Sequence, residues 1–307
     1  MKLKIAVTIQ TFVIVGLIAL IGWLVYSQIP ETSGRLLDVQ DGQIVTEPRE
    51  ESGYRTTGDK IYLDVGGIGQ VWLPVLEGVP VCERDLSQQV TRNGQVFYLD
   101  KDQITSHLGV DVSAYQGDID WETVKASGID FALIRCAYRG YGSGALLRDE
   151  AFDKHMQGAL AAGLDVGVYC FSQAVTVEEA VEEADLTLSM LEGYDITYPV
   201  VFDWEVISAE DVRTAEISVE MLTDCAAAFC ERVKAAGYIP MIYQNKRTSL
   251  LKLELPALSS YDFWLAEYAD TPSYYYDYQI WQYCSDGIVP GIDGVVDMNI
   301  CYKNYGE

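Results

Sequence analysis

Two carboxylates separated by one residue close an apolar run in the segment PVVFDWE (199–205); they are Asp203 and Glu205. Side chains at positions i and i+2 of a β-strand face the same side, about 6.6 Å apart along the strand. Both acids would therefore leave the end of a buried strand together. A lone acid at a strand end is typical of a helix cap or a solvated loop. Burying two acids costs several kcal/mol, so a buried pair indicates a functional site. A neutral acid beside a charged carboxylate is the pair that hydrolyses a glycosidic bond.

Two further aspartates end predicted strands elsewhere in the chain. Asp111 lies in LGVDVS (108–113), the first strand of the C-terminal region, and Asp297 ends the last strand, GVVDMN (294–299). In a closed barrel the first and last strands are neighbours, and catalytic groups gather at the C-terminal ends of strands. We therefore expect four carboxylates from three strands at one mouth. Because crowded carboxylates cannot all ionise cheaply, at least one should have a raised pKa and keep its proton near pH 7.

Aromatic residues occupy equivalent positions near the predicted strand ends. Sugar rings present apolar C–H faces to aromatic planes while their hydroxyl groups pair with acids, so an acidic, aromatic groove suits a glycan. Because aromatic residues on strands are often core residues, we expect about half of these positions, which also include Tyr141, Trp281 and Tyr283, to be core. The residues from which we expect substrate contacts are Tyr138, Tyr169, Phe171, Tyr243, Trp264, Tyr268 and Gln282.

The elements that must position these residues alternate regularly from position 108 to the end. Helical stretches separate the first strands, and glycines at 163, 193 and 237 follow three of those stretches, where helices commonly end. The pattern predicts an α/β fold, an irregular TIM-like (β/α)5(β)3 barrel, with an open doubly wound sheet as the alternative. No GxGxxG motif supports a nucleotide-binding version of that sheet. The eight predicted strands are LGVDVS, DFALIRCA, DVGVYCF, PVVFDWE, YIPMIYQ, DFWLAEY, YQIWQYC and GVVDMN.

A long apolar segment stands near the N-terminus. Residues 5–30 carry no charge, include the run FVIVGLIALIGWLVY and follow Lys2 and Lys4. A membrane-spanning helix needs about 20 apolar residues, whereas the core of a cleaved signal has about 7–15. The segment predicts an uncleaved single-pass anchor in the cell membrane through residues 5–26, with the lysines cytoplasmic and the following domain extracytoplasmic. The alternative is a long signal peptide, whose cleavage would give a secreted protein.

Three regions follow the anchor segment of residues 1–30. Residues 31–58 are polar with weak periodicity, which predicts a stalk. The short alternating runs KIYLDV, QVWLPVL and QVFYLD predict a small β-meander subdomain over 59–106. The remaining residues, 107–307, form the predicted barrel.

Composition excludes several classes of function. Lys and Arg number 21 against 46 Asp and Glu, a formal charge of −25, and such a surface repels nucleic acid. Seven cysteines with no CxxC pair and only two histidines do not make a zinc site of standard spacing. We expect no metal, no cofactor and a monomeric protein. An odd cysteine count leaves at least one thiol free in a monomer.

Several ordered motifs together resemble the family 25 glycoside hydrolases, the Chalaropsis-type lysozymes. The resemblance covers about residues 108–303, nearly the whole of the predicted barrel. Trp204 stands between Asp203 and Glu205, the two acids of the DxE motif. The motifs are DVSAYQGDIDW (111–121), VKASGIDFALIRCAYRGYGSG, GLDVGVYCFSQAV (163–175), YPVVFDWE (198–205), FWLAEY (263–268) and IWQYCSDGIVPGIDGVVDMN (280–299).

The resemblance implies N-acetylmuramidase activity: cleavage of the β-1,4 bond between N-acetylmuramic acid and N-acetylglucosamine in peptidoglycan, without metal or cofactor. It implies that Glu205 is the general acid, that Asp203 orients the substrate acetamido group or stabilises the cationic intermediate, and that Asp111 and Asp297 support them. The acetamido group would be the nucleophile, although strand spacing alone leaves direct carboxylate attack and inversion open. Two alternatives remain: a non-catalytic cell-wall glycan-binding or scaffold protein, and an enzyme of this fold acting on another N-acetylated glycan.

Overall fold

The computed structural model describes residues 36–40, 43–47, 56–57, 60–65, 69–101 and 103–306. These residues separate into a small unit, within 1–53 and 62–73, and a large unit of 54–61 and 74–307. No helix in the described ranges is long and apolar enough to cross a bilayer. The predicted anchor, residues 5–26, lies outside the described residues.

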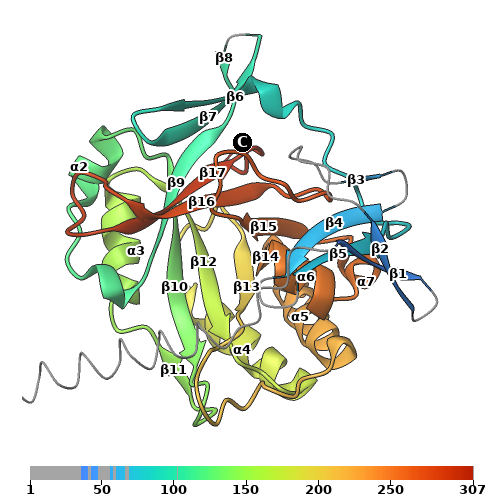
Figure 1. Cartoon of the computed structure of the whole chain (residues 1–307). Helices are drawn as coiled ribbons and strands as arrows, with labels where there is room; N and C mark the ends of the chain where they lie inside the picture. Colours follow the sequence, from blue (N-terminus) through green and yellow to red (C-terminus); the bar gives the residue numbers. More distant parts are fainter. Residues whose placement is uncertain are drawn as a thin grey trace, which may run out of the picture. The chain divides into compact units, whose positions relative to one another are not determined.

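Eight strands of the large unit close into a barrel (Figure 1). The sheet is parallel from the first strand through the seventh, while the eighth runs antiparallel to both of its neighbours. Closure confirms the predicted eight-stranded barrel and rules out the open sheet. The strands are β9 (His107–Val112), β10 (Phe131–Arg139), β12 (Asp165–Ser172), β13 (Val200–Trp204), β14 (Pro240–Asn245), β15 (Asp262–Ala266), β16 (Ile280–Gly287) and β17 (Val296–Cys301).

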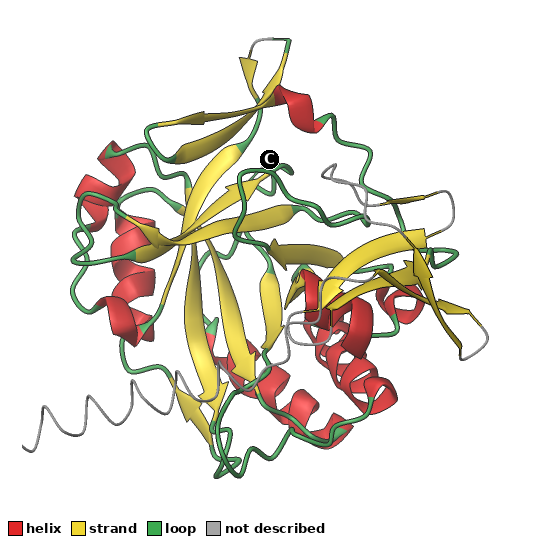
Figure 2. Cartoon of the chain, in the orientation of Figure 1, coloured by secondary structure: helices red, strands yellow, loops and turns green. Residues whose placement is uncertain are grey.

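Helices follow each of the first five barrel strands and lie outside the barrel (Figure 2). Four of them begin after an Asp, Thr, Ser or Asn whose side chain accepts a hydrogen bond from a backbone N–H of the first turn. Gly163, Gly193 and Gly237, near the ends of three helices, have positive φ as predicted. The helices are α2 (Trp121–Ala126), α3 (Phe152–Ala161), α4 (Val177–Met190), α5 (Val219–Ala235), α6 (Lys246–Lys252) and α7 (Leu255–Leu258).

Alternation along the barrel strands divides the buried side chains between two clusters. The larger cluster lies between barrel and helices, and the smaller one fills the barrel interior. Phe131 belongs to the interior cluster, and its ring crosses β9 at Gly109. A Cβ at Gly109 would lie 2.2 Å from Phe131 Cζ, so this position accepts only glycine without repacking. The interior below the mouth is therefore a packed floor.

The segments before the barrel are grouped differently from the prediction. A three-stranded antiparallel sheet belongs to the large unit and consists of β6 (Gln89–Arg92), β7 (Gln95–Asp100) and β8 (Gln103–Ile104). Its first hairpin turns at Asn93 and Gly94, which both have positive φ, as a type I′ turn requires. The short strands β3 (Thr56–Thr57) and β11 (Leu146–Arg148) also belong to the large unit.

The small unit contains two strands that lie inside the predicted stalk. Its strands have the order β2-β1-β5-β4, with β1 and β2 antiparallel and β1 and β5 parallel. The structure therefore has two strands within residues 31–58 and divides the strands of 59–106 between the two units, while the predicted domain boundaries stay predictions. The strands are β1 (Leu36–Gln40), β2 (Gln43–Glu47), β4 (Lys60–Val65) and β5 (Gly69–Pro74).

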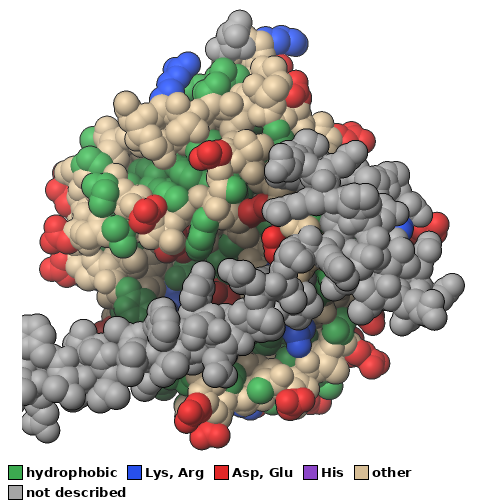
Figure 3. Space-filling model, in the orientation of Figure 1, with side chains coloured by type: hydrophobic (Ala, Val, Ile, Leu, Met, Phe, Trp, Pro, Cys, Tyr) green, Lys and Arg blue, Asp and Glu red, His purple; other side chains and the backbone are tan. Residues whose placement is uncertain are grey.

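On the face shown in Figure 3, the acidic side chains of the described residues do not form one patch. In the view of Figure 3, acidic side chains are scattered over the face of the large unit among apolar and polar ones. This visible face therefore offers no extended basic surface to a polyanion.

Candidate active site

Alternation along β13 turns Asp203 and Glu205 toward the barrel interior. Phe202 and Trp204 pack in the cluster under the helices, whereas Val201 belongs to the interior cluster. Asp203 lies two residues after Val201 and therefore also points inward, and Glu205 follows the last residue of the strand. The period-two prediction for this pair of acids is confirmed in position, since both line the same cavity.

Asp111 and Asp297 face each other across two neighbouring strands. They are directly paired residues of β9 and β17. Asp297 was predicted at the end of the last strand; this is wrong, because it is the second residue of β17. The antiparallel direction of β17 resolves the difference, since the first residues of an antiparallel strand lie at the same mouth as the last residues of its neighbours.

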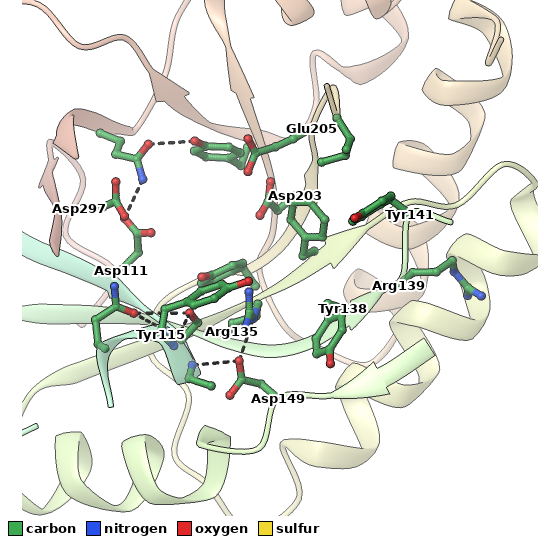
Figure 4. A pocket seen from close by; sticks show the side chains of 18 of the residues that line it. Asp111, Tyr115, Arg135, Tyr138, Arg139, Tyr141, Asp149, Asp203, Glu205 and Asp297 are labelled. Carbon is green, nitrogen blue, oxygen red and sulfur yellow. Dashed lines mark hydrogen bonds and ion pairs between the residues drawn. The ribbon is translucent and has the colours of Figure 1, made fainter. Parts of the chain in front are cut away.

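The four acids line one cavity of about 790 Å³ at the barrel mouth (Figure 4). Among the residues that the structure describes, no group of three His, Cys, Asp or Glu side chains could hold a metal ion. All eleven residues predicted as catalytic or substrate-binding border this cavity, while their roles stay predictions. They are Asp111, Tyr138, Tyr169, Phe171, Asp203, Glu205, Tyr243, Trp264, Tyr268, Gln282 and Asp297.

Two side-chain amides hold Asp111. The amide nitrogens of Gln282 and Asn299 donate hydrogen bonds of 2.8 and 2.7 Å to the same oxygen, Asp111 Oδ2. These donors favour the charged carboxylate, but burial, with Asp297 second, outweighs them and raises the pKa of Asp111 to about 8. Asp111 is therefore fixed in place through Oδ2, and its other oxygen can contact a ligand in the cavity.

The amide orientations follow from the groups behind them. The Trp264 indole N–H can only donate, and it donates to Asn299 Oδ1 at 2.8 Å, so the Asn299 NH2 must face the carboxylate. The hydroxyl groups of Tyr243 and Tyr268 donate to Gln282 Oε1 at 2.9 and 3.0 Å, and the Gln282 NH2 faces Asp111. The cavity thus has a preorganised polar floor.

Burial raises the pKa of each of the other three acids, and neighbouring acids add to the rise at Asp203 and Glu205. For Asp203, burial acts first, followed by Glu205 and Asp111, while the Arg135 guanidinium opposes the shift. For Glu205, burial acts first and the nearby Asp297 second. Burial also raises the pKa of Asp297. Asp203 Oδ1 is buried with no hydrogen-bond partner among the described residues, which adds to the cost of charging this carboxyl group.

Arg135, Asp149 and Tyr115 also line the mouth and were not predicted from the sequence. Arg135 Nε donates to Asp149 Oδ2 at 2.8 Å, and the guanidinium carbon lies 5.1 Å from the ring centre of Tyr115. Arg135 follows Phe131 and Leu133 at a spacing of two residues along β10, so its side chain also points into the barrel. A charged residue at an inward-facing position of a buried strand could have revealed it in the sequence. Tyr115 lies in a short 3-10 helix after β9, where no alternation predicts a direction.

The aromatic residues divide between groove and core, as expected. Trp281 and Tyr283 pack in the cluster under the helices rather than at the rim. Trp264 and Tyr243 form part of the cavity floor, with exposed fractions of only 1% and 8%. Tyr268, which is 58% exposed, presents its ring at the edge of the cavity.

Comparison with known proteins identifies the domain. The model of the glycosyl hydrolases family 25 matches residues 110–292. The chain is 28% identical over 204 residues to lysozyme M1 of Streptomyces globisporus and 24% identical over 192 residues to the autolytic lysozyme of Clostridium acetobutylicum. Each match takes in 62% of this chain, and the matched regions cover 66% and 54% of those two relatives.

Solved structures share the fold. A bacterial lysozyme from Streptomyces coelicolor superposes with a TM-score of 0.51 at 25% identity, covering 63% of this chain and 90% of that one. The modular autolysin LytC from Streptococcus pneumoniae superposes with a TM-score of 0.58 at 20% identity, covering 80% of this chain and 57% of that one. At that identity the second likeness concerns the fold alone.

Proposed function

The chain belongs to the glycosyl hydrolases family 25, and from this premise we propose that it is an N-acetylmuramidase acting on peptidoglycan. The bond cleaved is the β-1,4 bond from N-acetylmuramic acid to N-acetylglucosamine. The observation that carries the proposal is the convergence of Asp111, Asp203, Glu205 and Asp297 on one cavity. The relatives named lysozymes support the substrate class.

Glu205 is the general acid in this proposal. Its carboxyl group accepts no hydrogen bond from the described residues, and burial together with Asp297 raises its pKa. A carboxyl that keeps its proton near neutral pH can protonate the leaving glycosidic oxygen. The Arg135 guanidinium opposes the rise in the pKa of Asp203, although burial, Glu205 and Asp111 outweigh it.

Asp203 acts on the substrate acetamido group. Its carboxyl group, which lines the cavity, would accept the acetamido N–H, and this contact orients the acetamido carbonyl oxygen toward the anomeric carbon. That oxygen attacks as the glycosidic C–O bond breaks and Glu205 gives up its proton. Water then opens the cyclic intermediate and returns a proton to Glu205, so the enzyme is regenerated.

Replacing Glu205 with glutamine tests the proposal. The variant should lose at least about 100-fold in the release of reducing ends from purified peptidoglycan, because a general acid contributes roughly 10²–10⁴-fold. Glu210, an exposed residue of the following loop outside the cavity, supplies the matched control Glu210→Gln, which should keep full activity. An active Glu205→Gln variant would remove Glu205 from the acid role, and an inactive wild-type chain that still binds wall would favour a scaffold.

We also propose that residues 5–26 anchor the enzyme in the cell membrane with the barrel outside. The charge-free apolar run behind Lys2 and Lys4 supports this topology. Fractionation of the expressing cell should find the full chain with the membranes, released by detergent and not by salt. Recovery in the medium of a chain that lacks its first 27 or so residues would instead indicate a cleaved signal peptide.

A further inference from the structure

Three arginines border the cavity, and Arg135 alone of them is largely buried with terminal guanidinium nitrogens that donate to no described residue. The guanidinium of Arg139 donates to two glutamates and two backbone carbonyls. Arg148 is exposed and lies beside Asp153. Arg135 donates through Nε alone, and its two terminal nitrogens donate to no residue in the described part of the chain. Its side chain is only 14% exposed, so these donors face the cavity rather than bulk water.

Arg135 is held rigidly. Its Nε binds Asp149, whose side chain is fully buried. Asp149 also accepts hydrogen bonds from the backbone N–H groups of Ala114 and Ala151, at 3.1 and 2.9 Å. The rings of Tyr115 and Tyr138 lie 5.1 and 5.2 Å from the guanidinium carbon. Little side-chain entropy remains to be lost when this arginine binds a ligand.

A local irregularity in β10 builds this arrangement. The pairing of β10 with β12 shifts register between Arg135 and Ala137. Strict alternation would turn Tyr138 away from the side that Arg135 faces, but the shift returns Tyr138 to the cavity. Figure 4 shows both side chains on the wall opposite Glu205 and Asp297, with Asp149 behind the arginine.

The open edge of a fixed guanidinium matches a carboxylate. Two parallel N–H donors bind both oxygens of such a group, and Arg is suited to this planar contact. Apart from Asp149, the cavity is lined by five acids, Asp111, Glu150, Asp203, Glu205 and Asp297, which would repel an anionic ligand placed beside them. Arg135 is therefore the largely buried position in the cavity where a negative substituent of the glycan can be accepted, whereas Arg148 is exposed and not held in this way.

We propose that Arg135 binds a carboxylate of the muramic acid side of the substrate, and that this contact makes the enzyme prefer peptidoglycan to chitin. The proposal rests on the muramidase function above. The carboxylate can belong to the lactyl ether of an unsubstituted muramic acid or to the stem peptide attached there. Chitin offers only N-acetylglucosamine and carries no carboxylate.

The test compares four substrates, two of which, the lactyl carboxylate and the lactyl carboxamide, differ only in one charge. Four glycans of equal length are cleaved by the full chain: N-acetylglucosamine only, alternating muramic acid with a free lactyl carboxylate, the same glycan as lactyl carboxamide, and the glycan with a stem peptide ending in a free carboxylate. The wild-type enzyme should favour one carboxylate glycan over the carboxamide about 10- to 100-fold in kcat/KM. The glycan that shows the preference identifies the source of the carboxylate.

Arg135→Gln should abolish that ratio by slowing the carboxylate glycan more than the carboxamide glycan, and Arg135→Lys should restore part of it. The exposed Arg247 of α6 supplies the control Arg247→Gln, which should leave the ratio unchanged. A partly unfolded variant lowers both rates equally, so the ratio stays informative. An equal loss on carboxylate and carboxamide glycans, or no preference in the wild-type enzyme, would overturn the proposal.

Binding separates this inference from the catalytic one. The Glu205→Gln variant, which should bind without turnover, is titrated calorimetrically with the carboxylate and carboxamide glycans. About 10-fold tighter binding of the carboxylate glycan, lost in the double variant with Arg135→Gln, supports the arginine contact even if the chain cleaves neither. Equal affinity for the two glycans contradicts the contact whatever the activity is.

Discussion

Replacing Asp203 with asparagine should stabilise the fold while it abolishes catalysis. Asp203 is 4% exposed, and one of its oxygens has no partner among the described residues. Burial, then Glu205, then Asp111 raise its pKa. Asparagine keeps the shape of the side chain and removes the charge that this environment penalises.

The size of the gain can be bounded. Two charges about 6.6 Å apart, as at positions i and i+2 of a strand, repel by about 2.5 kcal/mol at an effective dielectric constant of 20. Keeping a proton on an aspartate at pH 7 costs about 4 kcal/mol relative to an unfolded pKa near 3.9, which sets the ceiling. We expect Asp203→Asn to add about 1–3 kcal/mol to the free energy of unfolding, or roughly 3–10 °C in Tm.

The sign of the pH dependence distinguishes this cause from others. A carboxyl whose folded pKa is raised binds more protons in the folded than in the unfolded protein, so its contribution to stability falls as pH rises from about 4 toward the folded pKa. The advantage of Asp203→Asn should therefore be largest at pH 7 and small near pH 4. Urea unfolding of the full chain measures both, with Asp224→Asn on the exposed side of α5 as the control. A destabilised variant, or a gain independent of pH, would refute the reasoning.

Three further outcomes are expected. Asn299→Ala removes two buried hydrogen bonds and should cost about 2–4 kcal/mol in urea unfolding; a loss below about 0.5 kcal/mol would contradict the network. Gly109→Ala forces a methyl group onto the Phe131 ring and should lower Tm by several degrees, reflecting about 1–3 kcal/mol; an unchanged Tm would show that the floor yields. Asp297→Asn removes a charge that raises the pKa of Glu205, so the basic limb of the residual kcat/KM profile should move to lower pH; a shift upward would be inconsistent with this electrostatic picture.

Much of the site was predictable because it depends on two regularities. Period-two alternation places Asp203 and Glu205 on one side of a strand, and barrel closure makes the first and last strands neighbours. Together they bring Asp111 and Asp297 to the same mouth, where the structure pairs them directly. Neither regularity requires knowledge of side-chain packing.

Strand direction and irregularities were not predictable from alternation. A pattern of apolar and polar residues reads the same in both directions, so the antiparallel course of β17 is not encoded in GVVDMN. The register shift after Arg135 likewise depends on the pairing of β10 with β12. For β1 and β2 a signal did exist: the Asp-Gly pair at 41–42 stands between LLDVQ and QIVTE, and Asp-Gly is a preferred hairpin turn.

The products of digestion test the central claim most directly. Purified peptidoglycan is digested with the full chain, the new ends are reduced with borohydride, and the muropeptides are analysed by mass spectrometry. We predict reduced muramic acid at every newly formed end, absent from the Glu205→Gln digest. Reduced glucosamine at those ends, or products of peptide cleavage alone, would contradict the assignment of muramidase activity to the cavity lined by Asp111, Asp203, Glu205 and Asp297.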